Sequence, residues 1–170
     1  KINIAQNRIL ENINALKEFT HVDQDDISDV DIHKGIDSTL FLLESNFKNI
    51  QIQKYYYAKS LIKGYPGQLN QIWQNILINS AQAISDKGSI VITTKENSKF
   101  VFISIKDSGI GIKEDSINRI FEPYYSTKPQ GKGMGLGLHI CYKIIKHHNG
   151  KISVTSNKEK GTEFIVELPK

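Results

Sequence analysis

The sequence predicts an α+β fold, built as one ordinary domain with a short extension at its N-terminus. Apolar residues recur at helical spacing in residues 31–45, 68–85 and 136–148. Strand patterns occupy residues 50–57, 89–95, 100–106, 151–156 and 162–168. With 39% hydrophobic and 24% charged residues, the chain of 170 residues can form a core and stay soluble.

Composition and charge argue against several classes of protein. The net charge of +4 suits an anionic small ligand and is far below the positive charge typical of nucleic-acid-binding domains. Basic and aromatic residues meet at residues 54–59, but a half-buried strand explains them, so we expect no nucleic-acid partner. The single cysteine, Cys141, excludes an internal disulfide framework and is expected to be buried. Without a signal peptide or a membrane-spanning run, a cytoplasmic location is expected, and anchoring of a parent protein stays open.

Residues 1–20 form a separate amphipathic segment. Ile2, Ile9 and Leu16 lie seven residues apart, which is typical of a narrow helical stripe. A helix of this length is marginal alone, so it must dock on a second chain in a helical bundle or on its own domain. The chain begins inside this pattern, which indicates a fragment of a longer protein. The acidic residues 23–31 lack calcium-loop spacing and are interpreted as a linker.

The first helix and strand of the domain follow this linker. Residues 31–45 predict a helix whose apolar face consists of Ile32, Ile36, Leu40, Leu43 and Phe47. In residues 50–57, isoleucines alternate with glutamines, as in a strand. Residues 65–67, with the sequence Tyr-Pro-Gly, predict a turn.

The predicted helix at residues 68–85 contains no charged residue. Beside its apolar face runs a stripe of amides, formed by Gln71, Asn75, Asn79 and Gln82. A solvent-facing stripe would normally use Lys and Glu, which form helices better than Asn. Asn75 and Asn79 lie one turn apart and point the same way, and an amide oxygen can bind Mg²⁺. A plain surface stripe is the alternative.

The chain has two segments rich in glycine. One follows a predicted strand, and the other precedes the last predicted helix. The second strand of a predicted β-hairpin runs into Asp107, where a carboxylate can accept a hydrogen bond from an exocyclic amine. Gly109 and Gly111 would let the backbone approach a flat ring, although a strand-exit turn explains them too. Four alternating glycines at residues 131–137 precede the last helix, and such a backbone suits a phosphate or a flexible loop.

The segment between these two glycine-rich segments, residues 113–130, has no single pattern of secondary structure. Residues 115–121 predict a short helix, and hydroxyls with a lysine at residues 126–129 suit phosphate oxygens. A segment of this length without strong periodicity is often a lid. Asn149 and Gly150 close the last helix, and two strands end the chain.

Four motifs in this order resemble those of the ATP-binding catalytic domain of sensor histidine kinases. Residues 74–81 resemble its N box, residues 107–111 and 133–138 its two glycine boxes, and residues 121–124 its F box. The family belongs to the superfamily of gyrase, the Hsp90 chaperone and MutL. The resemblance implies a two-layer α/β sandwich of the Bergerat type, with a mixed sheet, helices on one face and an ATP lid. It divides the chain into residues 1–22, the end of a dimerisation helix, a linker at 23–30 and the catalytic domain at 31–170.

The resemblance also implies the site residues. It assigns Asn79 to the Mg²⁺ that bridges the phosphates, Asp107 to the adenine amino group and Thr162 to the adenine end. Thr127 and Lys128 are expected to reach the phosphates, and Lys128 and Asn75 to have catalytic roles. The other expected contacts of ATP come from Asn75 and from the two glycine boxes: Gly109, Gly111, Ile112, Gly133, Met134, Gly135, Leu136, Gly137 and Leu138.

One substitution changes the expected chemistry. Hydrolysing relatives carry a Glu that activates water one turn before the Mg²⁺ asparagine, and Asn75 stands there in this chain. Because an amide is no base at neutral pH, we expect slow ATP hydrolysis and survival of ATP until an acceptor arrives.

The acceptor is expected outside this chain. Residues 1–22 resemble the end of the second dimerisation helix, whereas the acceptor histidine belongs on the first, and no histidine here has its setting. The resemblance therefore implies transfer to a histidine of the parent protein, which is expected to be a homodimer, and relay to a response regulator. A serine kinase of the anti-sigma type and a nucleotide-gated module without transfer activity are the alternatives.

Overall fold

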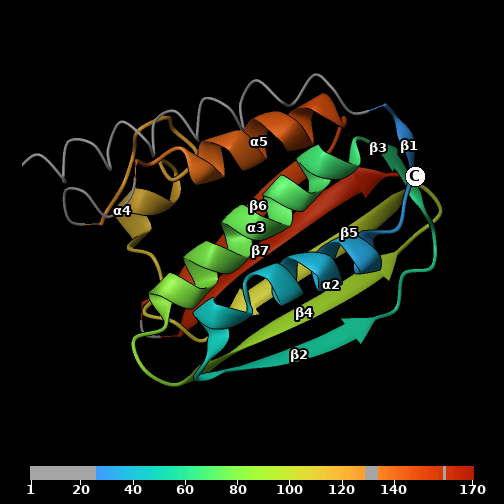
Figure 1. Ribbon diagram of the computed structural model, residues 1–170. Coiled ribbons are helices and arrows are strands. Elements are labelled where there is room, and N and C mark those ends of the chain that lie inside the picture. Colours follow the sequence, from blue (N-terminus) through green and yellow to red (C-terminus); the bar gives the residue numbers. More distant parts are fainter. Residues whose placement is uncertain (1–25, 129–133, 159) are drawn as a thin grey trace, which may run out of the picture.

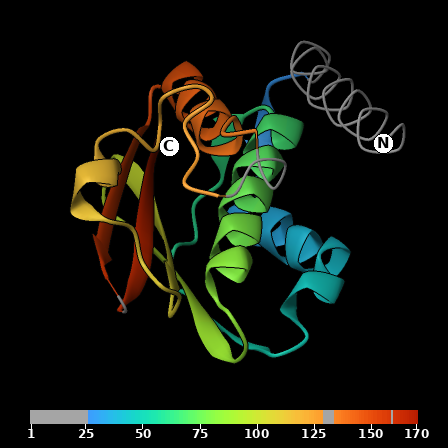
Figure 2. The ribbon, with the colours of Figure 1, turned by 90° about the vertical axis from the view of Figure 1, so that its left-hand side faces the viewer.

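The computed structural model describes residues 26–128, 134–158 and 160–170. One face of a five-stranded sheet is covered by the helices α2 (Ile32–Leu42), α3 (Pro66–Ala83) and α5 (Gly137–His147) (Figure 1). Figure 2 shows the two layers from the side, with α2, α3 and α5 on one side of the strands. The predicted two-layer fold with a mixed sheet is confirmed. The N-terminal helix expected at residues 1–22 and the start of the linker lie outside the described residues.

The sheet has the strand order β2–β4–β5–β7–β6. Its strands are β2 (Ile50–Tyr56), β4 (Gly88–Glu96), β5 (Phe100–Asp107), β7 (Gly161–Pro169) and β6 (Lys151–Asn157). β2 and β4 pair in parallel because α3 provides the crossover, and the other pairs are antiparallel. The central strand, β5, ends at Asp107, so this acid lies at the middle of one sheet edge.

Two helical segments follow the linker. Asp31 caps α2 because its Oδ1 accepts hydrogen bonds from the backbone N–H of His33 at 3.0 Å and Lys34 at 3.3 Å. The helix predicted at 31–45 ends earlier and continues as the 3-10 helix η2 (Glu44–Phe47). The buried side of this segment still includes Ile32, Ile36 and Phe47, as the periodicity predicts.

The structure corrects the predicted linker and the predicted turn. Residues of the linker form β1 (Ser28–Val30), which pairs antiparallel with the unpredicted strand β3 (Ile62–Gly64). Burial of Val30 and Ile62 explains this pairing, and strands of three residues are too short to show alternation. Residues 65–67 are also no separate turn, because Pro66 is the first residue of α3, where the fixed φ of proline suits a helix start.

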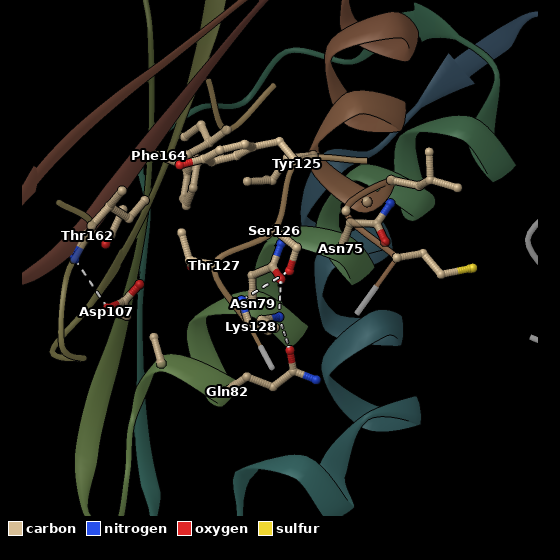
Figure 3. Close-up of a pocket in the computed structure, with 18 of the residues that line it drawn as sticks. Asn75, Asn79, Gln82, Asp107, Tyr125, Ser126, Thr127, Lys128, Thr162 and Phe164 are labelled. Carbon is tan, nitrogen blue, oxygen red and sulfur yellow. Dashed lines mark hydrogen bonds between the residues drawn. The ribbon is translucent and has the colours of Figure 1, made fainter. Parts of the chain in front are cut away.

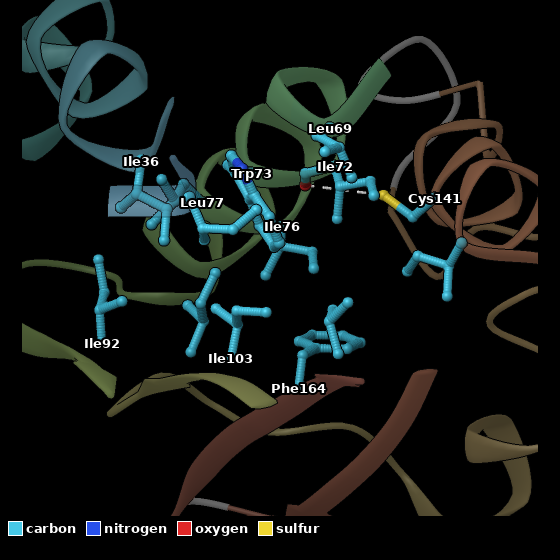
Figure 4. Packing of buried hydrophobic residues seen from close by; sticks show 14 of the residues in the cluster. Ile36, Leu69, Ile72, Trp73, Ile76, Leu77, Ile92, Ile103, Cys141 and Phe164 are labelled. Carbon is cyan, nitrogen blue, oxygen red and sulfur yellow. Dashed lines mark hydrogen bonds between the residues drawn. The ribbon is translucent and has the colours of Figure 1, made fainter. Parts of the chain in front are cut away.

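The core lies between the helices and the sheet. From α3, the side chains of Leu69, Ile72, Trp73, Ile76 and Leu77 are fully buried. They meet Ile92, Ile103 and Phe164 of the sheet and Ile36 of α2 (Figure 4). Cys141 of α5 is buried among them, as expected. The apolar face of α3 is thus used for packing, which leaves its amide stripe to face elsewhere.

The short helix α4 (Glu114–Ile117) begins near the predicted position and is shorter than predicted. The last helix and the final two strands end within a few residues of their predicted bounds. Within the part of the chain that is described, no helix combines the length and the apolar composition of a membrane span.

Candidate active site

A pocket of about 480 Å³ lies between the helical layer and the sheet (Figure 3). This volume is typical of small-molecule sites, which span about 300–1,000 Å³. Among the described lining residues, Asp107 is the only acid and Lys128 the only lysine or arginine. The lining comes from α3, the end of β5, the start of α5, the first part of β7, and neighbouring loops: Asn75, Asn79, Gln82, Ala83, Asp107, Ile110, Gly111, Ile112, Ile120, Tyr125, Ser126, Thr127, Lys128, Met134, Gly135, Leu136, Gly137, Leu138, Ile140, Thr162 and Phe164.

Asp107 lines the pocket, and two backbone hydrogen bonds hold its carboxylate. Its side chain is buried, and its Oδ1 accepts hydrogen bonds from the backbone N–H of Gly109 at 2.8 Å and of Thr162 at 3.2 Å. Burial raises the pKa of Asp107, and these two donors and the Ser80 side chain oppose that rise. Because both backbone donors bond to Oδ1, Oδ2 can accept a further hydrogen bond from a ligand.

The start of β7 packs directly on Asp107. Gly161 has φ of +86°, and a Cβ at this position would collide with the Asp107 carbonyl oxygen. Only glycine therefore brings the two strands this close without strain. Gly109 does not line the pocket: it packs against Ala83 and positions the Asp107 carboxylate through its N–H.

Ser156 of β6 connects two predicted site residues and was missed by the sequence analysis. Its hydroxyl accepts the backbone N–H of Ile112 at 2.8 Å and lies 2.9 Å from the Thr162 hydroxyl. It also donates to the Gly161 carbonyl at 3.0 Å. Nothing in the strand pattern distinguishes this serine from others, so no sequence signal could have identified it.

The amide stripe of α3 forms one wall of the pocket, because Asn75, Asn79 and Gln82 all line it. The Lys128 ammonium donates to Asn79 Oδ1 at 3.1 Å and to Gln82 Oε1 (Figure 3). Partial burial lowers the pKa of Lys128. The wall is therefore neutral and turns amide oxygens toward a cation. Gln71 belongs to the predicted stripe but does not line the pocket.

The second glycine box closes the pocket at the start of α5. Gly135, with φ of +67°, packs on the backbone of the F box, where an added Cβ would lie 2.5 Å from the Tyr124 carbonyl carbon. Gly137 begins α5 beside Asn75, whose Oδ1 would lie 3.3 Å from an added Cβ. Met134, Leu136 and Leu138 line the pocket, whereas Gly133 lies outside the described residues.

The F box is fixed by contacts that no local pattern predicts. His139 Nδ1 donates to the Phe121 carbonyl at 3.0 Å, and the Tyr125 hydroxyl donates to Ser116 Oγ at 2.8 Å. The Arg119 guanidinium lies 4.4 Å from the centre of the Tyr125 ring. These contacts hold the segment before Lys128 against α5 and α4.

The described residues contain no cluster of three or more His, Cys, Asp or Glu that could hold a metal ion alone. The donor set instead fits Mg²⁺ that is bound mainly by phosphate oxygens and water, which needs few protein ligands. The Asn79 oxygen faces the pocket and already accepts a bond from one cation, the Lys128 ammonium.

A two-layer sandwich with a strand-end acid, an amide-lined helix and a glycine-rich helix start defines an ATP-binding domain of the kinase and ATPase class. The profile described as "Histidine kinase-, DNA gyrase B-, and HSP90-like ATPase" matches residues 64–170, and the chain belongs to this family. More narrowly, the chain corresponds to the ATP-binding catalytic part of a sensor histidine kinase.

Curated relatives and solved structures agree with this assignment. Sporulation kinase A of Bacillus subtilis is 37% identical over 160 residues, which cover 92% of this chain and 24% of that protein. Sensor histidine kinase ZraS of Escherichia coli K12 is 34% identical over 166 residues, or 96% of this chain and 35% of that protein. The catalytic domain of histidine kinase ThkA matches with 31% identity and a TM-score of 0.77 over 85% of this chain and 96% of that chain. The chain thus spans about a third or less of the curated relatives it matches.

Proposed function

We propose that this chain binds Mg²⁺·ATP and donates the γ-phosphoryl group to a histidine that it does not itself contain. The observation that carries the proposal is the pocket, which combines a buried acceptor at Asp107, amide oxygens on α3 and the glycine-rich start of α5. This set matches the three parts of ATP: a base with an amino group, a metal-bound phosphate chain and its terminal oxygens.

The adenine end of the pocket is assigned to the sheet edge. Asp107 Oδ2 accepts a hydrogen bond from the exocyclic amino group, while Gly109 and Thr162 hold the carboxylate in place. Gly111 and Ile112 supply backbone and apolar surface beside the ring. An ionised carboxylate is needed as a pure acceptor, so this contact favours adenine over bases that lack an amino group there.

The phosphate end is assigned to α3, Lys128 and the start of α5. Asn79 Oδ1 would hold Mg²⁺, which when bound neutralises charge on the phosphate oxygens. Lys128 and Thr127 provide a cation and a hydroxyl for the phosphates. Backbone N–H groups at Leu136, Gly137 and Leu138 begin α5, where the helix dipole favours an anion.

The reaction requires an acceptor from outside the described residues. His33, His139, His147 and His148 do not line the pocket. In the proposed step, an imidazole nitrogen of the acceptor forms a bond to the γ-phosphorus, the bond from that phosphorus to the β–γ bridging oxygen breaks, and ADP leaves. Positioning and neutralisation of charge supply most of the catalysis in such transfers.

Asn75 accounts for the protection of ATP in the absence of an acceptor. Its amide lies beside Gly137 at the start of α5, where a general base for water would be expected in a hydrolysing relative. An amide cannot take a proton from water at neutral pH. Slow intrinsic hydrolysis follows.

The parent protein is proposed to supply the remaining partners. Residues 1–22 would belong to a dimerisation helix and residues 31–170 to the catalytic domain, which β1 joins through its pairing with β3, within a homodimer that carries the acceptor histidine. A solved relative, ThkA, forms a complex with the response regulator TrrA, and it matches with 28% identity and a TM-score of 0.79 over 99% of this chain and 50% of that chain. We propose relay of the phosphoryl group to such a receiver domain.

Phosphoryl transfer to an added dimerisation domain tests the proposal. The chain, Mg²⁺ and γ-labelled ATP are mixed with a dimerisation domain from the same parent, with its acceptor histidine present or replaced by Gln. The proposal is supported if the dimerisation domain is labelled only when its histidine is present and if acid releases the label. Acid-stable label on a serine would indicate the anti-sigma type of kinase, and ATP binding without any label would indicate a nucleotide-gated module.

A further inference from the structure

Lys128 occupies an unusual position, because its ammonium is held by two neutral amide oxygens. The two acceptors, Asn79 and Gln82, lie three residues apart on the last turns of α3 and face the pocket. The only acid among the described lining residues is Asp107. The cation therefore has no counter-ion at the pocket wall, and an anionic ligand would supply the missing charge.

The same Asn79 oxygen is the proposed ligand of Mg²⁺. An ammonium hydrogen bond at 3.1 Å and a metal bond at about 2.1 Å cannot share one oxygen in the same direction, because both cations would then be in contact. When the metal takes the side of the Asn79 oxygen that faces Lys128, the ammonium keeps only Gln82 as its acceptor on α3. Gln82 thus has a role that differs with and without the metal.

We propose that Gln82 is a positioning residue that holds the Lys128 ammonium at the phosphate end of the pocket while Asn79 serves the metal. The proposal rests on the proposed function, since it assumes that Mg²⁺·ATP occupies this pocket. Gln82 is an effective anchor because it sits one residue before the end of α3 and its side chain lines the pocket. It acts through Lys128 and not on the nucleotide itself.

The test measures binding of a nonhydrolysable ATP analogue by calorimetry, with Mg²⁺ and with a chelator. Gln82→Ala should weaken binding about threefold to tenfold with Mg²⁺, the range expected for one hydrogen bond, and clearly less with chelator, where Asn79 still holds Lys128. In a Lys128→Met background the same Gln82→Ala change should have no further effect, because the group that Gln82 positions is gone.

Gln74→Ala is the matched control, because Gln74 is an exposed residue of the same helix that does not line the pocket. It should bind like the wild type under both conditions. Equal effects of Gln82→Ala with and without Mg²⁺, or an effect that persists with Met at position 128, would overturn the inference. If the wild type itself fails to bind the analogue with Mg²⁺, the proposed function fails instead. Thermal unfolding of each variant excludes a loss of fold as the cause.

Discussion

Asp107→Asn changes one acceptor into a donor at almost constant shape. Both backbone donors, from Gly109 and Thr162, bond to Oδ1 of Asp107. An amide oxygen can keep these two bonds, so the new NH₂ group would replace Oδ2. A donor would then face the adenine amino group, which is a donor as well. The variant therefore removes the proposed ligand bond and preserves the bonds that hold the strand ends together.

The expected size of the effect follows from the charge on the lost acceptor. A hydrogen bond to a charged group contributes about 1.5–3 kcal/mol, which predicts a dissociation constant about 10- to 100-fold higher for an ATP analogue. The folded state of the variant, in contrast, should not be destabilised. Burial raises the pKa of Asp107, so its ionised form is less stable in the folded than in the unfolded chain at neutral pH. Removing the charge should leave the melting temperature unchanged or higher.

Calorimetry with ATP and inosine analogues in the presence of Mg²⁺ distinguishes recognition of the adenine amino group from a general effect on nucleotide binding. Inosine lacks the exocyclic amino group, so the wild type should prefer adenine and Asp107→Asn should lose that preference. Asp86→Asn, at an exposed acid just after α3, serves as the control and should behave like the wild type. A folded Asp107→Asn protein with wild-type affinity and adenine preference would refute the assignment.

Three further outcomes are expected. Asn75→Ala should leave the slow ATP hydrolysis unchanged in a coupled assay, and a large loss of turnover would mean that Asn75 assists water attack. Gly161→Ala should cost more than about 1 kcal/mol in urea unfolding, because its φ of +86° and the Asp107 carbonyl exclude a Cβ; an unchanged midpoint would contradict this. His148 Nε2 accepts the Tyr65 N–H, and burial lowers the pKa of His148. Stability should therefore fall as pH drops below about 6.5, the unfolded value, and His148→Gln should flatten that slope in urea unfolding at several pH values.

Local patterns predicted most of the fold because each long element shows its periodicity. The absence of charged residues from α3 was informative about its surroundings. One side of this helix packs in the core, and its amide side chains line the pocket. The short pair β1 and β3 escaped prediction because three residues cannot show alternation, and their pairing joins segments that are far apart in sequence. The misread turn at residues 65–67 has a different cause: Pro-Gly suits a turn, but proline also suits the first residue of a helix.

For the site, the motifs predicted which residues contact the ligand. They did not predict which other residues position those side chains. The contacts of Lys128 with α3 and of His139 with the F box join residues separated by 18 to 49 positions. No periodicity relates such positions, because the contacts depend on how the loops pack on the helices. Gln82 appeared in the sequence only as one member of an amide stripe, and its contact with Lys128 is what distinguishes it.

The clearest case is the support of Asp107 by Thr162, which depends on the register of two strands. Lys106 of β5 lies opposite Glu163 of β7, so the next residue of β5 meets the first residues of β7. A slip of one residue would turn Thr162 to the other face of the sheet and remove its N–H from the carboxylate. The glycine at 161 and the alternation of buried residues along β7 set this register together. The position of the acid in the pocket is therefore a property of the strand pair, which a motif of five residues around Asp107 does not contain.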